Sequence, residues 1–326
     1  MTLLLSVDFE DWHQLVRRRL GEPGWERPGP ALARQTHALL ALLDELDVKA
    51  TFFILGMAAR AHPELVDAVL RADHEIACHG DQHLPVHSQR AEELAADLRT
   101  ARATIEELTG RMAVGYRAPA FSITAAARWA YDVLAAEGFA YDSSQHDSPR
   151  IRGRVAPASG RPHALELDGG RRLWEFPLAV WRRGAVRVPV GGASYWGVLP
   201  TRVVLRGLAG VEQMAGLYLH PHEFDPQPLR AGDDPSASPH AGLGPSAPPH
   251  AARDPSASPH AGRNLSASPH RRARGRLREA QRNGARRRAP AMLRAIAGEH
   301  RLITYGEAYA ELSGSAPQGH GAGARP

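Results

Sequence analysis

Residues 3–13 read LLLSVDFEDWH, an apolar run that ends in three carboxylates within four positions. The run predicts a buried strand over Leu3–Phe9, with Asp8, Glu10 and Asp11 at its C-terminal end. Burying like charges this closely is costly unless a cation compensates them, and a metal ion is the usual cation. The stretch therefore predicts a functional site at the end of the first strand. The alternative is an acidic strand end that faces water.

Apolar runs and helical patterns alternate along residues 1–225. Short strands are predicted at Leu3–Phe9, Ala50–Leu55, Glu75–Cys78, Gly115–Arg117, Trp174–Leu178 and Leu217–His220. Helices are predicted between them at Leu32–Leu46, His62–Arg71, Ala91–Thr109 and Ala125–Gly138. This alternation favours an α/β fold with a mostly parallel sheet or barrel, and such folds carry their chemistry in the loops after the strand C-termini.

The composition changes after Pro228. Residues 231–270 lack aromatic residues and are rich in Pro, Ser, Ala, Gly and His, so this segment cannot form a core of its own. A ten-residue repeat places four histidines in register, at His240, His250, His260 and His270. Histidines at fixed spacing can bind a transition metal, but a tandem duplication tolerated as a disordered loop explains the repeat more simply.

The positive charge of the chain is local. The net charge is +5, yet the stretch 271–301 contains eleven arginines and two glutamates, so the remainder is mildly acidic. The hypothesis that the protein binds nucleic acid or another anionic polymer would be based on this stretch alone. A solvated helical face accounts for the same arginines, because arginine is a good helix former. We therefore expect no nucleic-acid partner.

The N-terminus and the cysteine content indicate the compartment. The single cysteine, Cys78, excludes an internal disulfide framework and a multi-cysteine zinc site. The N-terminus leads directly into acidic residues, without a secretory signal pattern, and no apolar run approaches 18 residues. We expect a cytoplasmic protein without a membrane span.

The HGDQH stretch places His79 and His83 four residues apart, directly after the predicted strand that ends at Cys78. A second pair, His83 and His87, has the same spacing, but Pro85 interrupts any helical turn between its members. The first pair can direct both imidazoles at one ion. Asp11 would complete a set of two histidines and one carboxylate, with positions open for water and substrate.

Two further motifs stand at strand ends. In GYRAPAF, Arg117 could orient a carboxylate base, although an ordinary structural ion pair is the alternative. In YLHPHEFDP, His220 ends an apolar strand and could donate a proton to a leaving group. The alternative is that His220 is an ordinary buried histidine whose ring nitrogens are hydrogen-bonded within the core.

The order of these motifs is more informative than any one of them. The succession SVDFEDWH, ATFFILG, HEIACHGDQH, GYRAPAFSIT, YDSS, WEFPL and YLHPHEFDP resembles the NodB-homology polysaccharide deacetylases, carbohydrate esterase family 4. Within the family it is similar to the branch associated with exopolysaccharide gene clusters, and to allantoinase-like and peptidoglycan-deacetylase-like members. The resemblance covers residues 1–228, with a weaker echo over 271–311.

The resemblance implies a distorted (β/α) barrel with a divalent metal, usually zinc. It assigns the metal to Asp11, His79 and His83. Arg117 would steady the catalytic carboxylate, and His220 would be the catalytic acid.

The first motif departs from the family pattern. The commonest form is TFDDG, whereas DFEDW places Glu10 at the position of the base aspartate and Asp8 at that of the threonine. The base is therefore Asp8 or Glu10, and Glu10 stays open as a metal ligand. His222 stands where a tryptophan is expected, and Asp73 replaces an expected glycine in a turn, which aspartate tolerates.

Four segments follow from these observations. We expect a NodB-like deacetylase domain over 1–230, a disordered repeat over 231–270, an arginine-rich extension that packs on the barrel over 271–312, and a disordered tail over 313–326.

The expected activity is metal-dependent removal of N-acetyl groups from an N-acetylated exopolysaccharide or its precursor. Water deprotonated by Asp8 or Glu10 would attack the acetamide carbonyl, and His220 would protonate the departing amine. Two alternatives remain open: a cyclic amide hydrolase of allantoinase-like type, and a saccharide-binding barrel without turnover.

Overall fold

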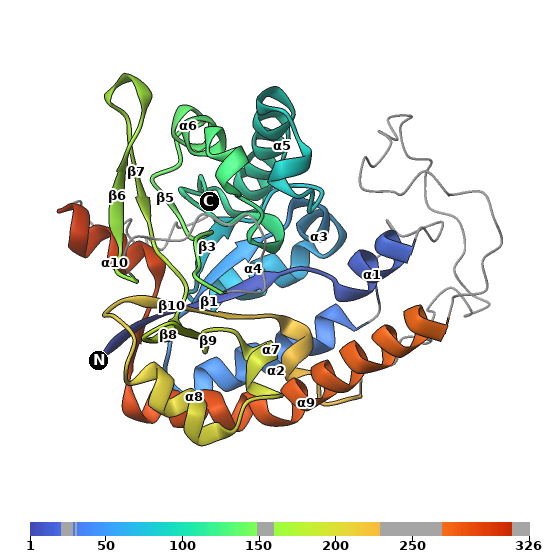
Figure 1. The fold of residues 1–326 in the computed structure, drawn as a ribbon. Coiled ribbons are helices and arrows are strands. Elements are labelled where there is room, and N and C mark those ends of the chain that lie inside the picture. Colours follow the sequence, from blue (N-terminus) through green and yellow to red (C-terminus); the bar gives the residue numbers. More distant parts are fainter. Residues whose placement is uncertain (21–28, 30, 149–159, 229–268, 315–326) are drawn as a thin grey trace, which may run out of the picture.

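The computed structural model of the protein describes residues 1–20, 29, 31–148, 160–228 and 269–314. One sheet dominates it, with the strand order β10-β1-β2-β3-β4-β5-β7-β6 and with β11 also paired to β1. Its strands are β1 (Thr2–Phe9), β2 (Thr51–Ile54), β3 (Glu75–Cys78), β4 (Gly115–Tyr116), β5 (Tyr141–Asp142), β6 (His163–Glu166), β7 (Arg172–Glu175), β10 (Ala215–Leu219) and β11 (Arg301–Ile303). The sheet curls into a half-barrel, as Figure 1 shows, so the predicted α/β barrel-like fold is confirmed.

Nearly all neighbouring strands run parallel, as expected for strands connected by helices. Among the described pairs of this sheet, only β6 and β7 are antiparallel. A separate antiparallel hairpin joins β8 (Val180–Arg183) to β9 (Val186–Pro189). Parallel strands place their C-terminal ends along one edge, where the functional residues are expected.

The helices surround the sheet (Figure 1). They are α1 (Trp12–Leu20), α2 (Leu32–Glu45), α3 (Gly56–Ala61), α4 (Pro63–Arg71), α5 (Ala91–Thr109), α6 (Trp129–Ala136), α7 (Ala193–Trp196), α8 (Thr201–Leu208), α9 (Pro269–Glu299) and α10 (Tyr305–Ser313). Leucines at helical spacing account for the packing of α2: Leu32, Leu39 and Leu43 are buried. β1 is buried from Leu3 to its end, because neighbouring strands flank it and helices cover it.

Several predicted boundaries differ from the structure. The strand expected at Trp174–Leu178 is Arg172–Glu175, and Pro177, which lacks an N–H, follows it. The helix expected at His62–Arg71 starts at Pro63, after the separate helix α3. The helix expected at Ala125–Gly138 divides into a 3₁₀ turn at Ala125–Ala127 and α6.

The C-terminal extension adds a strand and two helices to the described structure. β11 pairs with residues 2–4 of β1, and β2 pairs with residues 6–9 of the same strand. α9 buries Ala285, Ala289 and Leu293 and contacts α7. Of the predicted repeat over 231–270, all but residues 269–270 lie outside the described residues, as does the predicted tail from residue 315 onwards.

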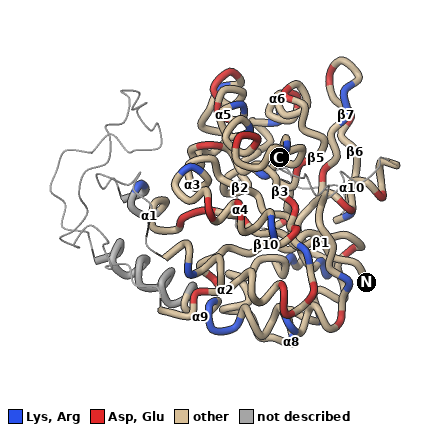
Figure 2. The backbone as a smooth tube through the Cα atoms, turned by 180° about the vertical axis from the view of Figure 1, so that it is seen from behind, with Lys and Arg blue, Asp and Glu red and all other residues tan. Residues whose placement is uncertain are grey.

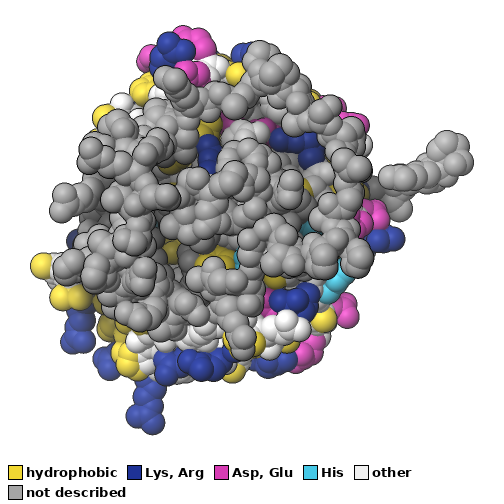
Figure 3. Space-filling model, turned by 90° about the vertical axis from the view of Figure 1, so that its right-hand side faces the viewer, with side chains coloured by type: hydrophobic (Ala, Val, Ile, Leu, Met, Phe, Trp, Pro, Cys, Tyr) yellow, Lys and Arg dark blue, Asp and Glu magenta, His cyan; other side chains and the backbone are white. Residues whose placement is uncertain are grey.

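Basic residues lie on the described part of α9 and on neighbouring α8 (Figure 2), and basic side chains follow the lower edge of the molecule in Figure 3. Arg287 and Arg288 are exposed, and Arg294 pairs with Glu45 of α2 at 2.7 Å. The exposure of these arginines agrees with the solvated helical face predicted for this stretch. Among the described residues, every helix is too short or too polar to cross a lipid bilayer.

Candidate active site

The predicted site residues, except Asp11, converge at the C-terminal edge of the parallel strands. Asp8 lies near the end of β1 and Glu10 directly follows it. His79 follows β3, Arg117 follows β4 and His220 follows β10. Since β10, β1, β2, β3 and β4 are neighbours in the sheet, their C-terminal ends bring these side chains together.

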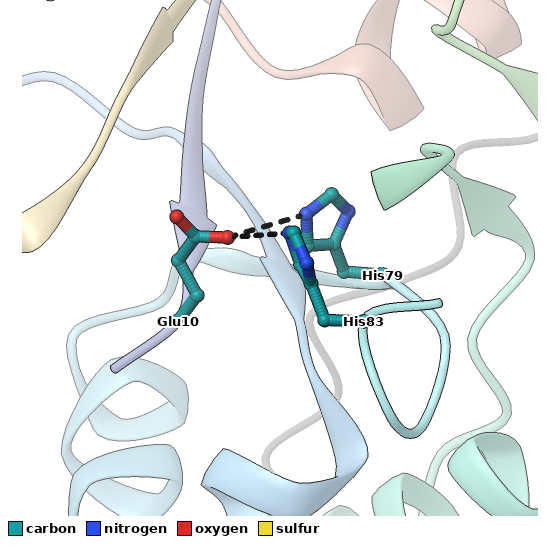
Figure 4. Close-up of side chains that lie close together, drawn as sticks. All are labelled: Glu10, His79 and His83. Atoms are coloured by element: carbon teal, nitrogen blue, oxygen red, sulfur yellow. Dashed lines mark ion pairs between the residues drawn. The ribbon is translucent and has the colours of Figure 1, made fainter. Parts of the chain in front are cut away.

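Glu10, His79 and His83 form one cluster, shown in Figure 4. Glu10 Oε2 lies 2.9 Å from His83 Nε2 and 3.8 Å from His79 Nε2. One potential ligand atom from each residue lies within 4.8 Å of the other two. This spacing allows all three side chains to reach a single ion.

The protonation of the cluster suits a metal. His79 Nδ1 lies 2.8 Å from the backbone carbonyl of Arg117, so Nδ1 donates the hydrogen bond and Nε2 keeps its lone pair toward Glu10. Burial lowers the pKa of His79 to about 4, which keeps the imidazole neutral. Burial alone would raise the pKa of Glu10, but the neighbouring His83, which is hydrogen-bonded to it, and His220 outweigh burial and hold that pKa well below its usual range. An ionised carboxylate and two imidazoles fit a divalent transition metal.

Asp11 lies elsewhere. Its Oδ1 accepts the backbone N–H of His13 at 2.8 Å, the geometry of a helix N-cap, because α1 begins at the next residue. Its Oδ2 accepts the backbone N–H of Gly29. The structure therefore does not bring Asp11 to the two histidines, and Glu10 occupies that place instead.

Asp8 is held by Arg117. The Arg117 side chain is fully buried, and its Nη1 donates to Asp8 Oδ1 at 2.6 Å and to Ser6 Oγ at 2.7 Å. Burial alone would lower the pKa of Arg117, but the charge of Asp8 outweighs it and raises that pKa, so the guanidinium stays charged. The other oxygen, Asp8 Oδ2, faces His220 Nε2 at 4.0 Å. One carboxylate oxygen is fixed and the other is directed into the site.

His220 faces both carboxylates. Its Nε2 lies 3.7 Å from Glu10 Oε1, and its Nδ1 lies 3.4 Å from Glu223 Oε2. Burial would lower the pKa of His220, but Glu223, Glu10 and Asp8 outweigh it and raise that pKa to about 9. His220 is therefore protonated at neutral pH and can donate from Nε2. Its ring also lies 5.1 Å from that of His222, the residue expected to be tryptophan.

A second set of residues holds the loop between the two cluster histidines. Arg60 of α3 binds both oxygens of Asp81, at 2.6 and 3.0 Å. Asp97 of α5 accepts the backbone N–H groups of Asp81 and Gln82. Sequence reasoning missed this set, although the Asp81 carboxylate lies within the HGDQH motif.

Sequence reasoning also missed most of the groups around Arg117. Ser143 of the YDSS motif accepts from Arg117 through its carbonyl, at 3.0 Å, and through its hydroxyl, at 2.9 Å. The hydroxyl of Tyr305 accepts from Nη2 at 2.9 Å. The YDSS motif was a usable signal for Ser143, whereas Tyr305 is 188 residues away and carried none.

Two family models match the sequence. The polysaccharide deacetylase model matches residues 28–138, and a domain of unknown function, DUF3473, matches residues 144–239. No curated protein matches the sequence.

Several solved structures resemble the chain, and the first of them shows the same fold. A proposed polysaccharide deacetylase from Mycobacterium smegmatis is 24% identical, with a TM-score of 0.50, over 68% of this chain and 77% of that one. The Puue allantoinase is 19% identical, with a TM-score of 0.48, over 68% and 77%. A family 4 carbohydrate esterase from Streptomyces lividans, solved with acetate, is 15% identical, with a TM-score of 0.41, over 68% and 79%.

Proposed function

We propose, from the premise that this chain belongs to the polysaccharide deacetylase family, that it hydrolyses N-acetyl groups of an N-acetylated saccharide. The observation that carries the proposal is the convergence of an Arg117-bound carboxylate, His220 with Glu223 behind it, and the Glu10–His79–His83 cluster on one edge of the sheet.

Glu10, His79 and His83 would hold a divalent metal, for which zinc is our proposal. When bound, such an ion polarises the acetamide carbonyl and makes water a better nucleophile near neutral pH. We assign the ligand carboxylate to Glu10 in place of Asp11, since Asp11 caps α1.

Asp8 is the proposed general base. Arg117 fixes Asp8 Oδ1 and keeps the carboxylate oriented, so Oδ2 remains available to accept a proton from water. Arg117 therefore acts by positioning the base.

His220 is the proposed general acid. Its Nδ1 faces Glu223, which stabilises the imidazolium, and its Nε2 points into the site. Nε2 can protonate the amine as the carbon–nitrogen bond breaks, so that acetate and a free amino sugar leave. We propose an exopolysaccharide or its precursor as the substrate, because the motif order resembles the exopolysaccharide-associated branch.

The test is release of acetate and primary amine from N-acetylglucosamine oligomers by the zinc-loaded protein. The two products are expected in equal amounts. His79→Ala and His83→Ala should each lower kcat/KM by about a hundredfold or more, as expected for lost metal ligands. His87→Ala is the matched control: His87 is exposed, contacts the Ser122 carbonyl, and should leave the rate unchanged. Full activity in either ligand variant, or no acetate from the wild type, contradicts the proposal.

A further inference from the structure

The C-terminal segment Arg301–Ser313 enters the buried interior at its start. It begins with β11, which pairs with the N-terminal half of β1, the strand that carries Asp8. Its helix α10 starts at Tyr305, which is fully buried. Both family models end before this segment, at residue 239 or earlier.

Tyr305 completes the hydrogen bonding of Arg117. A guanidinium has five N–H groups. In Arg117, Nε donates to the Ser143 carbonyl, Nη1 donates to Ser6 and Asp8, and Nη2 donates to the Ser143 and Tyr305 hydroxyls. Every N–H thus has one acceptor, and the Tyr305 hydroxyl is the one that comes from the C-terminal segment.

The ring of Tyr305 is fixed in place. Its backbone N–H donates to Thr51 Oγ1 at 2.8 Å, and the next N–H, of Gly306, donates to Glu75 Oε2 at 2.8 Å. Its ring lies edge-on to that of Phe53 at 5.5 Å. A Cβ atom at position 216 would lie 2.2 Å from the Tyr305 hydroxyl, so Gly216 of β10 leaves the space that the hydroxyl occupies.

We propose that Tyr305 is a positioning residue for the base, acting through Arg117, and that the segment Arg301–Ser313 is therefore part of the catalytic unit. The inference rests on the proposed function, in which Asp8 is the base. Loss of the hydroxyl leaves a buried guanidinium N–H without its acceptor, which is unfavourable. The guanidinium then shifts toward other acceptors and takes Asp8 Oδ1 with it, because Nη1 and Nη2 belong to one rigid plane.

Tyr305→Phe tests the proposal, because it removes only the hydroxyl. We expect kcat for acetate release to fall about tenfold while KM stays within about twofold, since a small misplacement of a catalytic group affects the chemical step. Tyr309→Phe is the matched control on the same helix: the Tyr309 ring packs against Tyr141 at 6.0 Å and is half-buried. It should leave both constants unchanged. Unchanged kcat in folded Tyr305→Phe overturns the proposal, as does a rise in KM alone.

A second readout is independent of activity. The side-chain N–H signals of Arg117, identified by their loss in Arg117→Lys, are expected to shift in the nitrogen–proton spectrum of Tyr305→Phe and to stay in place in Tyr309→Phe. If the wild type releases no acetate but these signals shift, the proposed function fails and the Tyr305–Arg117 coupling stands. If the signals do not move, the coupling is wrong.

Discussion

At the scale of single residues, adjacent carboxylates have different roles. Asp8 lies near the end of β1 and Glu10 directly follows the strand, and both carboxylates face His220 Nε2, at 4.0 and 3.7 Å. Asp11 comes one position later and begins the turn into α1. These contacts group Asp8 with Glu10 and separate both from Asp11, a distinction that the family motif alone leaves open.

This difference predicts that one isosteric change weakens zinc binding and that another leaves it nearly unchanged. Glu10→Gln should weaken zinc binding by about a hundredfold, because the anionic ligand is lost. Asp11→Asn should leave zinc affinity within about threefold, because Asn is also a good N-cap residue. Titration calorimetry with zinc measures both. Intact zinc binding in Glu10→Gln together with loss in Asp11→Asn would return the ligand role to Asp11.

At the scale of elements, His74 joins the starts of β2 and β3. Its Nδ1 accepts the backbone N–H of Ala50 at 3.3 Å, and its ring lies 5.1 Å from that of Phe52. Burial and the charge of Lys49 lower the pKa of His74 to about 4 from 6.5. The folded state therefore favours the neutral His74 ring. The stability that this neutral ring contributes is fully present above pH 6.5 and is lost as the pH falls through 4.

We expect His74 to contribute about 2 kcal/mol to the loss of stability between pH 7 and pH 4.5. His74→Asn keeps an acceptor near the Nδ1 position and does not titrate, so its free energy of unfolding should fall correspondingly less over this range. Denaturant unfolding at both pH values measures the difference. His37→Asn, at an exposed position of α2, is the control. An equal pH dependence in wild type and His74→Asn rules out this role.

The sequence predicted the elements whose local signals agree with the fold. The bounds of β3 and α5 match their predictions. For α5 the local signals are clear: alanine and leucine recur along the helix, and Gly110, which follows its last residue, adopts the left-handed conformation that ends it. β6, β8 and β9 were missed, whereas β7 was predicted with later bounds. The missed strands have four residues each and several half-exposed positions, so they lack the continuous apolar signal of a buried parallel strand.

At the scale of the whole molecule, the site is assembled from distant parts of the chain. Asp8 and Glu10 precede the first family match, His79, His83 and Arg117 lie within it, His220 lies within the second, and Tyr305 follows both. Parallel strands make this assembly possible, because each crossover returns the chain to the same edge. Sequence motifs could predict the residues at strand ends but not the contact between Arg117 and Tyr305, which depends on β11 joining β1.

The central claim is that one metal-binding centre at this edge performs amide hydrolysis. The most direct measurement is acetate release from N-acetylglucosamine oligomers by metal-stripped protein as zinc is added. We predict a negligible rate without zinc, a linear rise, and a plateau at one zinc per chain. Undiminished acetate release by the stripped protein, or a rate that does not respond to zinc, would contradict the claim.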